Sequence, residues 1–407
     1  MSVPTAAGSV PGCAVSARLS PADFRRYRLD AIFRGGKWDA QIFDRCAIAD
    51  RALLLGREDW AELESAAAAL YAETLHVERR LHALAREAGT ARFLPRRAWN
   101  RLRALPPHAF DDRARLMRFD FHPTADGWRL SEVNSDVPGG LNEASNFHRL
   151  WPGPAAGWGA TGDPARAYVE HVISAFGLRP GARVGLVHAT AYSDDWQQMA
   201  FFRELLTAAG VDAVGIAPTA VELRADGMHE SGGQLDAALR FFPGDWLLFA
   251  GEGAPWFERH PENLSNPLGA LYSQNKYFPV ACAALGVATP TWARYLPRTF
   301  RLALADLGGS RDLAKPCFGR VGEDIGAIDQ LDRRSRLGIA LDLLFGRGLW
   351  IRQEEFRSLN LGSEAEPIRA CVGVYCVGGK VVGGYGRLTG ERFVDMRATD
   401  SPLFVVN

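Results

Sequence analysis

The chain has 407 residues, enough for two or three domains with sizeable hydrophobic cores. Its 47 basic and 47 acidic residues balance, which argues against nucleic acid or an anionic membrane surface as a partner. Six scattered cysteines form no CxxC pair, and no run of roughly 18 apolar residues offers a membrane span, so the composition predicts a cytoplasmic protein with reduced thiols.

The N-terminal part is predicted to be a tail followed by helices. Residues 1–20 are small and polar, with no basic region before an apolar run, and indicate a disordered tail rather than a signal peptide. Glu58–Gly89 is rich in Ala, Leu, Glu and Arg, with apolar residues at helical spacing. We therefore expect one long helix or two joined ones here, with Gly89 as a plausible stop.

A hairpin with clustered polar groups follows. A His-Pro-Thr-Ala-Asp-Gly turn joins two β-like segments, Leu116–Phe121 and Trp128–Val133. Because side chains alternate between the two faces of a strand, Arg118 and Asp120 share one face of the first strand. Glu132 and Asn134 likewise share a face of the second. Mg²⁺ prefers such hard oxygen ligands, completed by substrate phosphates. The hairpin therefore predicts a nucleotide triphosphate site; the alternative is a surface turn with solvated charges.

Strands then alternate with helices, which predicts a small doubly wound α/β unit at 161–260, after a domain at 21–160 that holds the helices and the hairpin. The expected helices are Pro164–Gly177 and Asp194–Gly210, and the expected strands are Arg183–Thr190, Val211–Ala217 and Trp246–Ala250. No GxGxxG motif is present, so a dinucleotide site is not supported.

The last region, 261–407, combines helices with strands and a second hairpin. The expected helices are Lys276–Leu285 and Ser335–Leu344, the expected strands Ala314–Phe318 and Leu349–Phe356, and the hairpin pairs Arg369–Val377 with Lys380–Arg387.

Two lysines of this region suit a phosphate site. Lys315 ends a strand and precedes a glycine-containing turn, Gly319–Ile325. Glycines let backbone N–H groups approach phosphate oxygens, and lysine adds a point charge. Lys276, in the stretch SQNKYF, would be a second such lysine. The alternatives are an ordinary hairpin turn and a solvated helix residue.

Two more polar groups stand on predicted strands. Gln353-Glu354-Glu355 could meet adenine edges and ribose hydroxyls, or form a strand edge with outward charges. Arg387 follows a glycine-rich stretch and is either a functional arginine or a turn residue.

In this order the pieces resemble the synthetase domain of the glutathionylspermidine synthase family, which belongs to the ATP-grasp ligases. The matching stretches are RFDF…LSEVNSD, NPLGALYSQNKYFPV, AKPCFGRVGEDI, IRQEEF, GGYGRLTG and ATDSPLFVV. The resemblance implies an α/β (α+β) protein with an ATP-grasp fold in permuted order, since the metal ligands precede the ATP lysines. It also implies a preATP-grasp-like domain at 161–260 and a nucleotide-binding region at 261–407.

The resemblance implies a role for each candidate residue. The implied ligands of two Mg²⁺ ions are Asp120, Glu132 and Asn134. The implied ATP contacts are Lys276, Lys315, Gly319, Arg320, Gly322, Gln353, Glu354 and Glu355. Arg118 and Arg387 match arginines that hold the reacting centre.

The function that follows is ATP-dependent joining of a small-molecule or peptide carboxylate to an amine acceptor through an acyl phosphate. Two alternatives stay open: a kinase or phosphotransferase on the same ATP site, and a non-catalytic ATP-binding protein of the same fold. Where the family tends to have serines near the acceptor peptide, this chain has Val137-Pro138-Gly139-Gly140, and its phosphate loop contains Glu323-Asp324. The acid and the amine are therefore left open.

Overall fold

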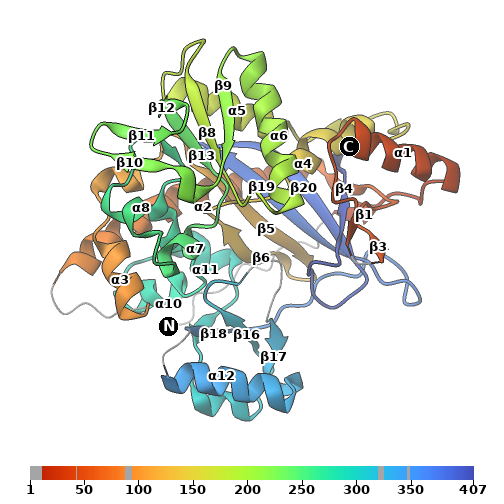
Figure 1. Cartoon of the computed structure of the whole chain (residues 1–407). Coiled ribbons are helices and arrows are strands. Elements are labelled where there is room, and N and C mark those ends of the chain that lie inside the picture. The colour runs from red at the N-terminus through yellow and green to blue at the C-terminus, as the bar shows by residue number, and fades with distance from the viewer. Residues whose placement is uncertain (1–11, 43, 88–93, 320–324, 346–348) are drawn as a thin grey trace.

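The computed structural model describes residues 12–42, 44–87, 94–319, 325–345 and 349–407. At its centre lies a five-stranded antiparallel sheet in the order β21-β20-β19-β5-β6 (Figure 1). Its strands are β5 (Leu116–Thr124), β6 (Gly127–Asn134), β19 (Arg369–Val377), β20 (Lys380–Thr389) and β21 (Thr399–Ser401). Both predicted hairpins are confirmed, and the pairing of β5 with β19 joins them into one sheet.

A second, parallel sheet lies above the central one in Figure 1, in the order β14-β13-β8-β9. Its strands are β8 (Arg183–Val187), β9 (Asp212–Ile216), β13 (Ala237–Arg240) and β14 (Leu264–Ser265), accompanied by helices α5 (Pro164–Ala175) and α6 (Ser193–Ala208). The chain leaves β8 for β9 on one side and returns to β13 on the other. The predicted alternation of strands and helices is confirmed here.

One predicted strand is wrong. Of the predicted strand Trp246–Ala250, residues 246–249 lie in helix α7 (Gly244–Phe249), and the strand of the parallel sheet that follows β9 is instead β13. An apolar run of five residues does not distinguish a buried strand from a helix turn. Leu247 and Leu248 are buried in the core, whereas Trp246 and Phe249 are 41% and 49% exposed, so only one side of this helix turn is buried.

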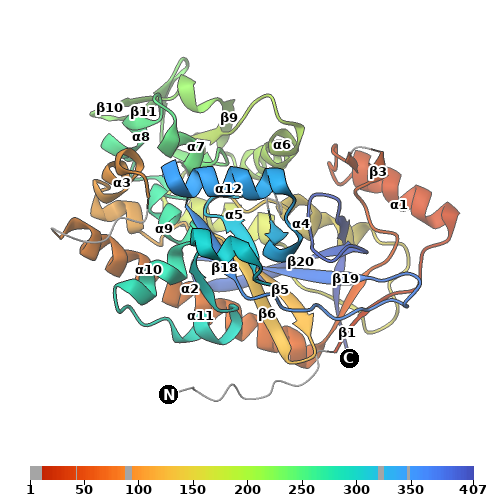
Figure 2. The ribbon, with the colours of Figure 1, turned by 90° about the horizontal axis from the view of Figure 1, so that it is seen from below.

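A third sheet forms a separate lobe, at the bottom of Figure 1, in the antiparallel order β15-β18-β16-β17. Its strands are β15 (Thr299–Arg301), β16 (Leu313–Pro316), β17 (Gly326–Ala327) and β18 (Trp350–Gln353). Helix α12 (Arg333–Phe345) covers the lobe and lies in front of it in Figure 2. Its core contains Leu302, Ala314, Ile328, Ile339 and Trp350.

The chain ends meet in a fourth sheet, in the order β1-β4-β22-β7. Its strands are β1 (Cys13–Val15), β4 (Leu53–Gly56), β22 (Leu403–Val406) and β7 (Gly159–Ala160). The expected tail over 1–20 is therefore wrong for its second part: β1 pairs with β4, and the Ser20 side chain caps helix α1 (Pro21–Phe33). Residues 1–11 lie outside the described residues. Helix α4 (Leu141–Leu150) packs against α1 and against β20.

Helix α2 (Arg57–Arg86) confirms the long predicted helix, and it packs on β19 and β20. Gly89, its expected stop, lies outside the described residues. The other helices are α3 (Arg96–Arg103), α8 (Ala254–Glu258), α9 (Leu271–Gln274), α10 (Phe278–Ala284) and α11 (Pro290–Tyr295). The other strands are β2 (Gln41–Ile42), β3 (Arg45–Cys46), β10 (Glu222–Arg224), β11 (Gly227–Glu230) and β12 (Gly233–Leu235). Among the helices that the structure describes, none is long and apolar enough to cross a membrane.

A buried ion pair fastens α2 beneath the central sheet. Arg115 donates to both carboxylate oxygens of Glu78, at 2.8 and 3.0 Å, and both side chains are at most 1% exposed. The Ser273 hydroxyl also donates to Glu78. We expect Glu78→Ala to lower the free energy of unfolding by about 3–5 kcal/mol, because it leaves a buried guanidinium unpaired. Urea unfolding followed by circular dichroism measures this, with Glu64→Ala on the same helix as the control. Equal midpoints for the two variants would contradict the prediction.

Candidate active site

The strand register brings the polar residues of the first hairpin together. Asp120 stands opposite Glu132, and Arg118 stands opposite Asn134. A bulge shifts the pairing just beyond Asp120, between it and Phe121. The four polar side chains therefore lie on the part of the hairpin where the register is continuous. The predicted grouping of Arg118, Asp120, Glu132 and Asn134 at one end of the hairpin is confirmed.

Arg118 and Asp120 form a tight bidentate pair on this face. The Arg118 Nε and Nη2 atoms donate to the two Asp120 oxygens at 2.6 and 2.8 Å, and Nη1 donates to the carbonyl oxygen of Gly139 at 2.7 Å. Asn134 Nδ2 donates to Asp120 Oδ2 at 3.0 Å. The amide oxygen of Asn134 is not used in this bond. The planar guanidinium donates two parallel N–H bonds to the carboxylate, which fixes the orientation of both side chains; a lysine cannot do this.

Glu132 lies beside the two predicted phosphate lysines. Lys276 Nζ is 3.2 Å from Glu132 Oε2. Burial of Glu132 opposes its ionisation, but the charges of Lys276, Lys315 and Arg118 together lower its pKa to about 2. Glu132 is therefore a carboxylate at any physiological pH, and it can share cationic neighbours with an anionic ligand.

The third sheet carries Lys315 toward the hairpin. Lys315 Nζ donates to Gln353 Oε1 at 2.7 Å and lies 3.5 Å from the carbonyl oxygen of Ser131. Burial lowers the pKa of Lys315 to about 8; Glu132 opposes this shift and Lys276 adds to it. Ser131 stands on β6, the edge strand of the central sheet, and Lys315 stands on β16, so this contact joins two sheets around the same charges.

Of the remaining residues predicted to contact the nucleotide, some lie beside Lys276 and Lys315 and others point away from them. Gln353 also donates to Thr299, which fixes its amide. Glu354 instead forms an exposed pair with Arg298, and Glu355 binds Arg392. Both glutamates lie beyond the end of β18 at Gln353, so neither stands on a strand edge, and each pairs with an arginine instead. The Gly319 carbonyl oxygen accepts a 2.6 Å bond from Lys276 Nζ. Arg320 and Gly322 lie outside the described residues.

Arg387 reaches the same face from β20. Its Nη2 donates to the carbonyl oxygen of Asp395 at 2.6 Å, and its Nε lies 4.0 Å from Asp400 Oδ1 without a hydrogen-bond partner. Burial opposes its charge, but the neighbouring Tyr385 and Asp400 raise its pKa. Arg387 is therefore a cation with an unused donor, not a turn residue: β20 continues to Thr389.

Three residues on β19 and β20 complete the face, and the sequence reasoning missed them. Gly373 stands opposite both Asp120 and Tyr385. A Cβ at Gly373 would lie 2.7 Å from Arg118 Cδ, so only glycine leaves room for the arginine. The rings of Tyr385 and Tyr375 lie 5.6 and 6.0 Å from the Arg118 guanidinium carbon. A glycine inside an apolar strand was the signal that could have marked this close approach.

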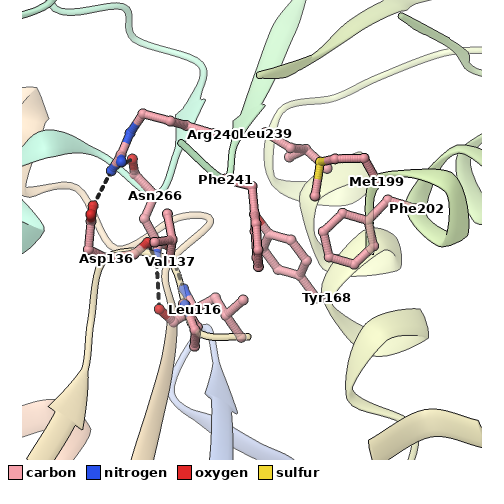
Figure 3. Close-up of a pocket in the computed structure, with 11 residues that line it drawn as sticks. Leu116, Asp136, Val137, Tyr168, Met199, Phe202, Leu239, Arg240, Phe241 and Asn266 are labelled. Atoms are coloured by element: carbon pink, nitrogen blue, oxygen red, sulfur yellow. Dashed lines mark hydrogen bonds and ion pairs between the residues drawn. The ribbon is translucent and has the colours of Figure 1, made fainter. Parts of the chain in front are cut away.

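Two narrow pockets flank the hairpin. One encloses about 300 Å³ of unfilled space, counting open solvent, beside Glu132 and Lys276, with Trp292 and Leu296 as apolar walls. The other lies at the carboxyl end of β13, where the central and parallel sheets meet. Figure 3 shows Arg240 reaching to Asp136 there. Only the first pocket lies against the charged face.

The donor set fits a hard cation. Asp120, Glu132 and Asn134 supply two carboxylates and an amide, which are the oxygen ligands that Mg²⁺ takes together with substrate phosphates. The described part of the chain contains no group of three or more His, Cys, Asp or Glu side chains placed to hold a metal ion. A cation here would therefore depend on ligand phosphates to complete its coordination.

The chain is a mixed α/β protein whose fold is similar to that of ATP-grasp-type proteins. A family model described as glutathionylspermidine synthase preATP-grasp matches residues 33–402, and the chain belongs to this family. The family suggests a ligase.

A solved structure shows a similar fold. A glutathione synthetase-like effector from Globodera pallida, in its apo form, is 11% identical with a TM-score of 0.59, over 95% of this chain and 98% of its own. A putative gamma-glutamylcysteine synthetase from Methylobacillus flagellatus KT is 15% identical with a TM-score of 0.46, over 82% of this chain and 86% of its own. No curated protein sequence matches the chain.

Proposed function

We propose that the protein is an ATP-dependent carboxylate–amine ligase that forms an amide through an acyl phosphate. The observation that carries this proposal is the meeting of Glu132 with Lys276 and Lys315, where β6 and β16 approach each other. Ammonium groups beside a carboxylate that stays ionised suit a polyphosphate bound together with a divalent cation.

The residues divide the chemistry between them. Lys276 and Lys315 bind the phosphates of ATP, and Gln353 orients Lys315 through its 2.7 Å bond. Asp120, Glu132 and Asn134 would hold Mg²⁺, and we propose two such ions. Bound Mg²⁺ would neutralise the charge that develops on the phosphates. Because these acids precede the lysines in the chain, we also propose that the ATP-grasp elements occur in permuted order.

The two arginines act on the other substrate. A substrate carboxylate oxygen attacks the γ-phosphorus, and ADP leaves with the electron pair of the broken bond. The amine nitrogen then attacks the acyl carbon, phosphate leaves, and the amine gives up a proton to solvent. Arg387 has an unused Nε donor, and Arg118 keeps two N–H groups beyond its three bonds. These donors bind the carboxylate first and the tetrahedral oxyanion later.

A product-resolved screen tests the reaction class. The purified chain is incubated with ATP, Mg²⁺ and pairs drawn from amino acids, small peptides and polyamines, and ADP release is followed by mass analysis of products. We expect ADP release that needs both an acid and an amine, with one amide formed per ADP. ADP with a phosphorylated product and no amide would establish a phosphotransferase instead. Nucleotide binding without any ADP release would establish a non-catalytic protein.

Removing either phosphate lysine should weaken nucleotide binding. Lys315→Met and Lys276→Met each delete a charged hydrogen bond worth about 1.5–3 kcal/mol, so the Kd of a non-hydrolysable ATP analogue should rise roughly 10- to 150-fold. Calorimetric titration measures it. Lys380→Met, at the exposed first residue of β20, is the matched control. Unchanged affinity in both site variants would return these lysines to a structural role.

The same titration should reveal the depressed pKa of Lys315. At pH 9 a lysine with a pKa of about 8 is mostly neutral in the free protein. Bound phosphates favour the ammonium form, so binding should take up a proton at pH 9 and not at pH 6.5. Titration in two buffers of different ionisation enthalpy counts that proton. Lys315→Met should lack the uptake; equal uptake in both proteins would contradict the assignment.

A further inference from the structure

Lysine is scarce in this chain and is concentrated around the site. Only four of its 47 basic residues are lysines: Lys37, Lys276, Lys315 and Lys380. Lys380 is exposed, whereas Lys276 and Lys315 belong to the proposed phosphate site. The fourth, Lys37, is 3% exposed, and the proposed mechanism does not use it.

The Lys37 ammonium occupies a socket of three carboxylates. Its Nζ lies 2.6 Å from Glu143 Oε1, 2.8 Å from Asp400 Oδ2 and 2.9 Å from Asp39 Oδ1. Lys37 Nζ donates a hydrogen bond to Glu143, and its contacts with Asp400 and Asp39 are ion pairs. Burial opposes the charge, but the carboxylates raise the pKa of Lys37 well above its usual value. Lys37 is therefore a fixed cation, not a nucleophile.

Asp400 connects this socket to the candidate reacting centre. Its Oδ2 binds Lys37, while its Oδ1 accepts a hydrogen bond from the Tyr385 hydroxyl and lies 4.0 Å from Arg387 Nε. The Tyr385 ring lies 5.6 Å from the Arg118 guanidinium carbon. One carboxylate thus links Lys37 to the environment of both arginines.

Hydrogen bonds from two helices hold the backbone segment that carries Lys37. The segment leaves α1 through Gly36, whose φ of +67° favours glycine. Asn142 Nδ2, from α4, donates to the Gly36 carbonyl oxygen at 3.1 Å. Gln197 Oε1, from α6, accepts the Trp38 N–H at 2.7 Å. Figure 1 shows α1, α4 and β20 close together. The lysine therefore enters the socket from a segment pinned by two helices.

We propose that Lys37 is a positioning residue of the active site, whose ammonium holds Asp400 and through it the Tyr385 hydroxyl and the Arg387 guanidinium. Without this cation, Asp39, Glu143 and Asp400 would repel one another, and Asp400 would turn toward Arg387 as its nearest remaining cation. The unused Nε donor of Arg387 would then be consumed by Asp400 instead of facing a substrate. This inference rests on the proposed function for its effect on turnover, but not for its effect on Arg387.

Chemical rescue separates positioning from general stability. Lys37→Ala empties the socket, and propylammonium can refill it with an N–H donor group, whereas tetramethylammonium has none. Lys37→Met keeps the hydrocarbon volume without the charge and covers the case in which the alanine variant does not fold. Lys380→Met is the matched control at an exposed lysine. Three quantities are measured for each: ADP release, affinity for a non-hydrolysable ATP analogue, and the rate at which phenylglyoxal modifies Arg387, read by peptide mass spectrometry.

We expect both Lys37 variants to lose about 10- to 100-fold in ADP release, as residues that orient a functional group typically do, with nucleotide affinity within about twofold because the phosphate lysines are untouched. The rate at which phenylglyoxal modifies Arg387 should fall in both variants, because Asp400 would then occupy its Nε donor. Propylammonium, but not tetramethylammonium, should restore turnover and the modification rate of Lys37→Ala saturably.

The outcomes distinguish this inference from the proposed function. Wild-type turnover in Lys37→Met would overturn the positioning role, and so would propylammonium that raises the melting temperature of Lys37→Ala without restoring turnover. If the wild-type chain releases no ADP with any acid and amine, the ligase proposal fails by itself. Lys37 is then judged by Arg387 modification alone, and an unchanged rate in both variants would overturn the inference.

Discussion

Glu132→Ala is expected to abolish ATP turnover while leaving the fold intact. Glu132 is held ionised by three surrounding cations and stands opposite Asp120 in the hairpin. Removing it takes one of two carboxylates from the proposed cation site and leaves the charges of Lys276 and Lys315 without their protein counterion. Metal stabilisation of transferring phosphoryl groups contributes several kcal/mol, so turnover should fall by at least roughly a thousandfold.

ADP release under saturating ATP measures the loss, and circular dichroism verifies the fold. Asp126→Ala, in the exposed turn of the same hairpin, is the matched control and should turn over ATP at the wild-type rate. Glu132→Gln keeps the size of the side chain and removes its charge, so it should also fail. Near wild-type turnover in Glu132→Ala would refute the assignment of this hairpin as the cation site.

The second large effect is expected at the arginines. Arg118→Lys should cut amide formation roughly 10²- to 10³-fold, the usual loss when one oxyanion donor is removed. Lysine cannot reproduce the planar fork that grips both Asp120 oxygens and the Gly139 carbonyl at once. The affinity for ATP should fall less than amide formation, because Arg118 donates to Asp120 and Gly139 and its replacement leaves Lys276 and Lys315 in place.

Arg387→Lys tests the other donor. It should reduce amide formation more than nucleotide affinity, because its unused Nε would be lost. Arg129→Lys is the control for both: it lies on the same hairpin, and its guanidinium binds the Arg294 carbonyl oxygen instead. Wild-type amide formation and nucleotide affinity in Arg387→Lys would place the oxyanion donor elsewhere, such as the backbone amides near Gly139.

The structure also shows how Arg118 is held in position. The sequence places Arg118 two residues from Asp120, a proposed metal ligand, and the structure shows Arg118 donating to both carboxylate oxygens of Asp120. Asp120 consequently has two tasks, and its substitution would disturb the arginine as well as any bound cation. This coupling predicts non-additive kinetics for the pair in a double-mutant cycle.

Local patterns in the sequence determined much of this protein. Alternation along residues 116–134 was enough to place four polar side chains on one hairpin face, because a strand has a strict period of two. The helical spacing after Glu58 was enough for α2. The sequence also predicted that Lys315 lies on a strand, because an apolar run before a glycine-containing turn is a local signal. Long, periodic segments carry this information within themselves.

Only the tertiary structure decided the rest. The pairing of β5 with β19 brings Gly373 and Tyr385 beside Arg118, and no local period encodes a contact between segments so far apart in the chain. The run WLLFA is helical because its environment, not its composition, sets its conformation. Lys37 reads in the sequence as an ordinary charged residue after a glycine pair. Burial against three carboxylates from distant segments makes it a fixed cation, because charge interactions strengthen where water is excluded.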